Sequence, residues 1–174
     1  MRQHCEIQLK EAKECESIQT AVALTLSSEI PSVYSVAKSG NIEVVQKYIA
    51  AEVAQFCSML PTARSVSPEA VLNIAKSFSQ HPDVRNFSLV ELKTFLSLAL
   101  KRMAFGKLYG GFGYDTLLDW LVQYNNERTE RILDYRDSEH AQFTAREKIQ
   151  RNRNYGDEWG VNDINQIIEK NDNL

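Results

Sequence analysis

The stretch that decides the fold runs from residue 88 to residue 135 and reads SLVELKTFLSLALKRMAFGKLYGGFGYDTLLDWLVQYNNERTERILDY. It predicts an apolar helix, a glycine-rich turn and a second, longer helix. Ser88 and Glu91 have the spacing of a capping box, in which each side chain accepts a hydrogen bond from the backbone amide of the other residue. Phe87 and Leu92 occupy the positions of a hydrophobic staple. Because the first helix is apolar on nearly every side, we expect it at the centre of a helical bundle.

Four glycines between residues 106 and 113 form the turn between the two helices. A lysine among glycines ahead of a helix suggests a phosphate-binding loop, because backbone amides at a helix N-terminus can hold an anion. A P-loop, however, follows a strand and places its lysine and a serine or threonine after the last glycine, whereas Lys107 lies among the early glycines. We therefore interpret the glycines as a tight turn that needs positive φ angles. Asp115 is the predicted N-cap of the second helix.

Apolar residues at helical spacing predict further helices along the chain. Asn41 is the expected N-cap of the clearest one, and Ser67-Pro68 begins the next. His81-Pro82-Asp83 is a predicted turn, because the residue before a proline disfavours helical angles. The second long helix is expected to break at Tyr155-Gly156. The predicted helices outside residues 88–113 cover residues 3–26, 32–38, 41–60, 67–78, 115–153 and 163–170.

The composition favours an all-α fold. Seven glycines and four prolines in 174 residues suit helices with short connections better than a β fold with many turns. We expect a bundle of about five to six helices over residues 1–136 and a charged helical extension over residues 137–174. After Tyr124 the apolar stripe thins and charges of alternating sign allow i,i+4 ion pairs. The second half of this long helix is therefore expected to project from the bundle or to bind a partner.

The net charge and the cysteine content limit the classes of protein to which this chain could belong. A formal charge of −3 argues against a strongly basic nucleic-acid-binding protein, although residues 61–113 carry about +4. Three cysteines without CxxC spacing predict neither a disulfide framework nor a zinc site. No apolar run is long enough to cross a membrane, and no signal pattern begins the chain. We expect a soluble, cytoplasmic protein with reduced thiols.

No residue pattern predicts catalysis. His4, His81 and His140 are scattered without metal-ligand spacing, and neither a GxSxG motif nor a Cys/His arrangement is evident. Asp115 and Asp119 are explained as a cap and a partner of the helix dipole. We therefore expect no enzyme activity, no cofactor and no metal.

Two groups of basic side chains are candidates for nucleic-acid binding, because cations interleaved with aromatic residues can follow a single strand by charge and stacking. The alternative is that they lie on solvated helix faces, or at a helix end where the negative C-terminus favours cations. The candidates are Lys101, Arg102, Lys107, Arg146, Lys148, Arg151 and Arg153.

Four aromatic side chains in and after the glycine-rich turn are candidate anchors for a protein partner. They would serve as anchors if their rings are exposed, since aromatic residues carry much of the binding energy of an interface. The candidates are Tyr109, Phe112, Trp120 and Tyr124.

The stretch from Phe87 to Arg128 resembles a motif in small all-helical proteins of phages and conjugative elements of gut bacteria. The motif has a leading Leu-x-Glu, an apolar helix, a Gly-x-Tyr/Phe-Gly turn, an aspartate or asparagine, and a helix with Leu-x-x-Trp-Leu-x-x-Tyr-x-x-x-Arg. The residues that carry the resemblance are Leu89 to Glu91, Gly106 to Gly110, Asp115, Leu117, Trp120, Leu121, Tyr124 and Arg128. The resemblance covers roughly residues 30–135, and the tail after residue 137 departs from it.

Proteins of this kind resemble replication accessory proteins, including loaders of the replicative helicase. The resemblance implies a non-enzymatic adaptor of phage or mobile-element DNA replication that binds a replicative helicase, single-stranded DNA or both. The alternative is a host-directed anti-defence or regulatory binding protein that forms homo-oligomers through its C-terminal helix. An enzyme without a recognisable motif is a third alternative.

Overall fold

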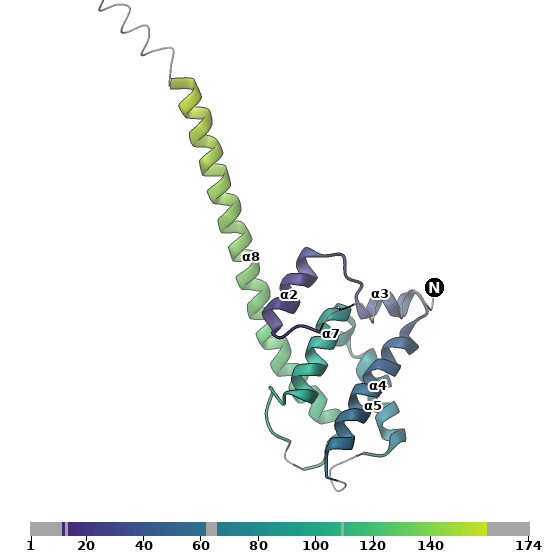
Figure 1. Ribbon diagram of the computed structural model, residues 1–174. Coiled ribbons are helices and arrows are strands. Elements are labelled where there is room, and N and C mark those ends of the chain that lie inside the picture. The colour runs from purple at the N-terminus through teal and green to yellow at the C-terminus, as the bar shows by residue number, and fades with distance from the viewer. Residues whose placement is uncertain (1–11, 13, 62–65, 109, 160–174) are drawn as a thin grey trace, which may run out of the picture. The chain divides into compact units, whose positions relative to one another are not determined.

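The computed structural model describes residue 12 and residues 14–61, 66–108 and 110–159, with residues 151–159 described by their backbone alone. Apart from an isolated bridge between Ser32 and Ser88, the regular structure of these residues is helical (Figure 1). The elements are α2 (Ile18–Ser27), α3 (Val33–Lys38), α4 (Ile42–Met59), α5 (Pro68–Gln80), α6 (Pro82–Arg85), α7 (Leu89–Leu96), the π-helix η2 (Ser97–Lys101) and α8 (Tyr114–Trp159). The predicted all-α fold is confirmed.

Helix α7 is the centre of the bundle, as its sequence predicts. The capping box is present: the Ser88 amide donates to Glu91 Oε2 at 3.0 Å, and the Glu91 amide donates to Ser88 Oγ at 3.1 Å. From Leu89 to Leu100 every residue except Lys93 is buried. Helix α2 packs against α7 and α4 packs against η2, so the capped helix is covered on more than one side (Figure 1).

The predicted helix that follows the capping box is not regular to its end. The α-helix stops at Leu96, and a π turn continues it, with the Arg102 amide donating to the Ser97 carbonyl at 3.1 Å. The chain then leaves through Met103, which has a φ of 51°, an unusual angle for a residue with a side chain. Hydrophobic periodicity does not distinguish a π turn from an α turn, because both keep the apolar side chains inward.

The predicted helix over residues 3–26 is wrong over residues 14–17, because α2 begins only at Ile18, with Ser17 as its N-cap. We call residue 12 and residues 14–16 the strap; position 13 and residues 1–11 lie outside the described residues. Side chains of α7 and its continuation bond the backbone of the strap. The bonds are Lys93 Nζ to the Ala12 carbonyl (2.8 Å), the Cys15 amide to Thr94 Oγ1 (3.1 Å), and Arg102 Nη1 to the Glu16 carbonyl (3.0 Å). These bonds replace those that a helix would make within itself.

Two predicted helix starts are confirmed, and one predicted turn is corrected. Ser67 caps α5 through the Ala70 amide, with Pro68 in the first turn. Asn41 stands at the N-cap position of α4, but its side chain makes no capping bond. The predicted turn at His81-Pro82-Asp83 is instead the start of the short helix α6, because His81 Nδ1 accepts from the Asp83 amide at 3.3 Å and Pro82 suits a first turn.

The glycine-rich segment turns the chain by the means its sequence predicts. Gly106 has a φ of 117° and Gly110 a φ of 97°, angles that favour glycine. Helix α8 begins at Tyr114, so Asp115 lies in its first turn and the prediction that Asp115 is the N-cap is wrong. A carboxylate in the first turn still faces the positive end of the helix dipole.

Helix α8 continues through Tyr155-Gly156 to Trp159, so the predicted break there is wrong. A single glycine costs a helix only about 1 kcal/mol relative to alanine and does not by itself end it. The contacts of the chain form two compact units, the first ending at Ile132 and the second beginning at Leu133. The boundary predicted after residue 136 stays a prediction, and the predicted helix over residues 163–170 lies outside the described residues.

Candidate functional site

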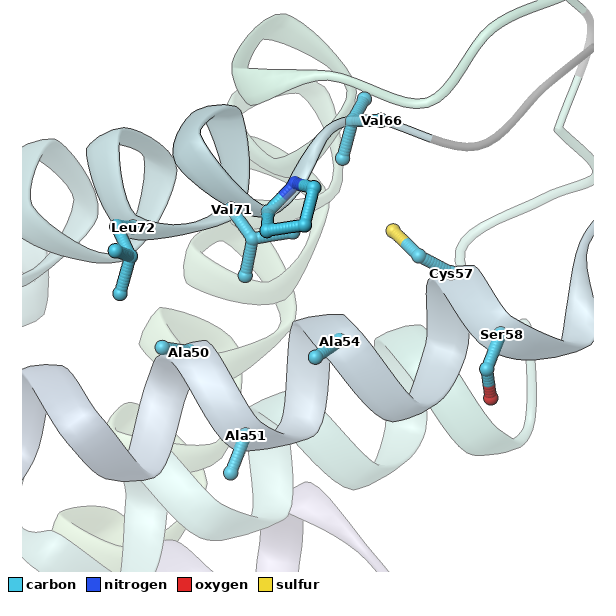
Figure 2. Close-up of a pocket in the computed structure, with 9 residues that line it drawn as sticks. Ala50, Ala51, Ala54, Cys57, Ser58, Val66, Val71 and Leu72 are labelled. Carbon is cyan, nitrogen blue, oxygen red and sulfur yellow. The ribbon is translucent and has the colours of Figure 1, made fainter. Parts of the chain in front are cut away.

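An open apolar groove lies between α4 and α5, which pack side by side (Figure 1). Its volume is about 520 Å³, within the usual range for ligand pockets. Figure 2 shows Ala50 and Cys57 of α4 on the side toward α5, with Val71 and Leu72 on the facing helix. The lining residues are Ala50, Ala51, Ala54, Cys57 and Ser58 of α4, Pro68, Val71 and Leu72 of α5, and Val66 of the connection between them.

The groove exists because one face of α4 carries small side chains beside its core stripe. The core stripe itself is closed, since Val45, Ile49 and Val53 are fully buried. The neighbouring positions 50, 51 and 54 are alanines, which leave the space next to α5 unfilled. On the opposite wall, Leu72 is 63% exposed, a high value for a leucine on a helix that packs against a core. The sequence pattern alone does not predict this site, because alanines next to an apolar stripe become informative only when the position of α5 is known.

A second hollow of about 350 Å³ shares Ala50 and Leu72 with the first and extends the groove toward the start of α4. Here the walls are polar, with Lys47 on α4 and Lys76 on α5, both exposed. Glu43 is the one carboxylate in this lining. The groove thus has an apolar end near the α4–α5 connection and a basic end near the beginning of α4.

The aromatic residues predicted as partner anchors are not exposed. Phe112, Trp120 and Tyr124 are buried, and the rings of Phe112 and Trp120 lie 5.0 and 6.3 Å from the ring of Phe56 in edge-to-face contact. Phe112 and Trp120 thus join the glycine-rich turn and α8 to α4, whereas the Tyr124 ring packs against Phe87 and Phe95. Rings of this size dominate a core when they can be covered. These three residues are therefore core residues and not anchors. Tyr109 lies outside the described residues.

A polar cluster is buried beneath the start of α7. Glu91 is fully buried, and Arg128 of α8 reaches it while the guanidinium lies 5.5 Å from the centre of the Phe87 ring. The hydroxyl of Tyr124 is buried without a hydrogen-bond partner among the described residues. Burial, followed by the negative charge of Glu91, raises the pKa of Tyr124. This cluster joins α7 to α8, and none of its residues lines the α4–α5 groove.

Two of the predicted nucleic-acid ligands bond the strap. Lys101 Nζ lies 3.1 Å from Glu14 Oε2 and 3.3 Å from Glu52 Oε2, and Arg102 bonds the Glu16 carbonyl. Although burial lowers the pKa of Lys101, its hydrogen bond to Glu14 and the nearby carboxylates raise it by more. Two carboxylates thus surround the ammonium of Lys101, so it offers little net positive charge to a phosphate.

The other basic candidates divide between the two units of the chain. Lys107 is exposed in the glycine-rich segment of the first unit, and Arg146 and Lys148 are exposed on α8 in the second. Arg151 and Arg153 belong to the helical part of α8 that is described by backbone alone. The role of all five residues in nucleic-acid binding stays a prediction.

Near the strap lies a further network that the sequence does not predict. The Lys93 ammonium lies 5.5 Å from the centre of the Tyr48 ring. Burial lowers the pKa of Lys93, and burial together with the charge of Glu52 raises the pKa of Tyr48. The residues come from helices far apart in sequence, so no local motif indicates the network.

A third hollow, of about 640 Å³, lies between α2, η2 and the first part of α8. Its α8 wall is polar, with Gln123, Asn126 and Glu130, and the Arg131–Glu127 ion pair spans 3.9 Å along it. This wall offers less apolar surface to a partner than the α4–α5 groove does.

Within the described residues no group of three or more His, Cys, Asp or Glu side chains could hold a metal ion. No helix of the described part of the chain is long and apolar enough to cross a membrane. Comparisons of the chain with protein-family models, with curated proteins and with solved structures find no match.

Proposed function

We propose that this protein is a non-enzymatic accessory protein of phage or mobile-element DNA replication, an adaptor that resembles helicase loaders. Its protein partner, a replicative helicase, binds in the α4–α5 groove. The observation that supports this proposal best is the groove itself, an open hollow lined mostly by apolar side chains.

The groove has the properties of an interface more than of a packing defect. Leu72, on the α5 wall of the groove, is 63% exposed. Apolar surface gains about 25 cal/mol for each Å² removed from water, so a partner that covers the Leu72 side chain gains affinity. The resemblance over residues 30–135 supplies the replicative helicase as the partner.

Single-stranded DNA is the second expected ligand. Lys107, Arg146 and Lys148 are exposed cations that could contact phosphates. Binding carried by such contacts falls steeply with salt, because each phosphate contact releases a counterion.

The test is capture of a purified replicative helicase by the immobilised full chain, together with single-stranded DNA binding measured across a range of salt concentrations. We expect Ala54→Glu, which places a charge on the apolar wall, to abolish helicase capture. Gln55→Glu makes the same change in charge one residue later, outside the groove lining, and should leave capture intact. Retention of neither helicase nor DNA by the wild-type chain would remove the proposal.

The alternative, a host-directed binding protein that oligomerises through its C-terminal helix, has its own supporting observation. Leu133, Phe143 and Ile149 of α8 are 54%, 61% and 58% exposed. Light scattering of the full chain and of a chain ending at Asp137 discriminates between the two functions. A particle mass that falls from oligomer to monomer on truncation supports the alternative, and a monomer in both cases contradicts it.

A further inference from the structure

We propose that the α4–α5 groove binds a short amphipathic helix of its protein partner, with acidic residues at the end that meets Lys47 and Lys76. This inference rests on the proposed function for the existence of a protein partner. It adds the chemical class of the segment that the groove accepts.

The lining of the groove selects a helix over other peptide conformations. An extended peptide binds by adding a strand to a sheet edge, and the described part of the chain contains no sheet. A polyproline segment needs a groove lined by aromatic rings, and none of the lining residues is aromatic. Insertion of a helix into a hydrophobic groove is the mode that aliphatic walls favour.

The alanines set how closely the partner helix approaches. Helices pack with their axes about 8–10 Å apart, and the smaller side chains at the contact give the shorter distance. Ala50 and Ala54 are one turn apart on α4 and line the apolar end, while Val71 and Leu72 form the facing wall. Large aliphatic side chains of the partner therefore fit between the alanines of α4 and the branched side chains of α5 (Figure 2).

The length of the groove sets the length of the partner helix. On α4 the two hollows extend from Glu43 to Ser58, which is about 22 Å at a rise of 1.5 Å per residue. A helix of roughly four turns spans this distance. Its apolar anchors would lie at positions i, i+3 or i+4, and i+7.

The basic end sets the direction in which the helix binds. Lys47 and Lys76 lie on opposite walls of the polar hollow, with Glu43 as the one carboxylate of that lining. Exposed ion pairs contribute little affinity, so the apolar contacts hold the helix and the charges choose its orientation. A partner helix with acidic residues at the end that meets Lys47 and Lys76 therefore fits the groove in one orientation.

The test uses a fluorescent synthetic helix of about 16 residues, with leucines at i, i+3 and i+7 and two glutamates at one end. A matched probe carries lysines in place of the glutamates. Anisotropy is measured with the full chain. We expect the acidic probe to bind about tenfold more tightly than the basic probe at low salt.

Variants of the chain locate the binding site of the probe. Ala54→Glu should abolish binding, and Gln55→Glu should leave it unchanged. The double variant Lys47→Glu with Lys76→Glu should reverse the preference, so that the basic probe binds more tightly. Equal binding of the two probes, no measurable binding of either, or full binding to Ala54→Glu would overturn the inference.

The outcomes separate this inference from the proposed function. Binding of the acidic probe without capture of the helicase supports the helix-binding groove and removes the replicative helicase as its partner. Helicase capture without probe binding overturns the helix class and leaves the adaptor function in place.

Discussion

Arg128 of α8 donates from Nε to Oε1 of Glu91 across 2.5 Å, and through this bond the long helix is tied to the capped start of the central helix. Glu91 is fully buried, whereas the Arg128 side chain is 22% exposed. One carboxylate therefore caps α7 through the Ser88 amide and pairs with α8. A buried charge with two partners is costly to isolate.

Replacing Arg128 with methionine should destabilise the protein by about 3 kcal/mol, because it leaves the Glu91 carboxylate buried and unpaired. The double variant Arg128→Met with Glu91→Gln should recover part of this loss, since glutamine is neutral and can still complete a capping box. Urea unfolding measures both free energies of unfolding. Arg131→Met is the matched control, since Arg131 is 38% exposed and forms a 3.9 Å pair with Glu127 on the surface. A double variant no more stable than the single variant would contradict the account.

Tyr124→Phe should leave stability unchanged or raise it by up to about 1 kcal/mol, because it removes a buried hydroxyl that lacks a hydrogen-bond partner among the described residues. Thermal unfolding of the two proteins at matched pH is the measurement. A clear loss of stability would mean that the hydroxyl has a partner, such as a buried water bonded to Glu91.

The strap should loosen when its backbone bonds are removed. Thr94→Val deletes the acceptor of the Cys15 amide, which costs about 1–2 kcal/mol. Opening of the strap, and with it the labelling of the Cys15 thiol by a maleimide, should become roughly tenfold faster. A Cys5→Ser background leaves two thiols that mass spectrometry distinguishes, and Cys57 in the groove is the internal control. Equal acceleration at Cys57 would indicate general destabilisation and not local opening.

Glu14 should make stability depend on pH in the acid range. A hydrogen bond from Ser97 lowers its pKa, burial opposes this effect, and Lys101 lowers the pKa further. Because the folded pKa lies below the usual value of 4.5, the stabilisation is complete above that pH. It is lost as the pH falls through the lowered pKa.

The comparison of wild type with Glu14→Gln over pH 7 to 3 tests this dependence. The stability of the wild type should exceed that of the variant near neutrality, and the difference should shrink as the pH falls. Glu29→Gln, at an exposed position in the segment after α2, is the control. A difference that stays constant over the whole range would contradict a lowered pKa at Glu14.

The glycine-rich turn offers a matched pair of substitutions. Gly106→Ala should destabilise by about 1–2 kcal/mol, since its φ of 117° is strained for alanine although no atom crowds the added Cβ. Gly111→Ala should be tolerated, because its φ is ordinary and its surroundings are equally open. If both substitutions cost the same, the turn would not depend on the positive φ at Gly106.

Much of the helical framework could be predicted from the sequence, because its signals are local. The capping box at Ser88, the cap-and-proline start at Ser67-Pro68 and the stripe of α4 each lie within one element. The strap could not be predicted, because residues 14–16 have a helical composition and are held by side chains some 80 positions later in the chain. Long-range bonds override local propensity there.

The site was harder to predict than the fold. The sequence favours the aromatic residues at positions 112, 120 and 124 as anchors, yet a core buries large rings when neighbours can cover them. The groove depends instead on the alanines of α4, whose small size becomes informative only when the position of α5 is known. An absent side chain leaves little trace in a hydrophobic pattern.

Protein binding in the α4–α5 groove can be measured by hydrogen–deuterium exchange of the full chain, with and without a purified replicative helicase. We expect slower exchange in the complex over residues 43–58 and 66–76, which include the lining of the groove. Slower exchange confined to residues 133–159 of α8, with α4 and α5 unchanged, would contradict it.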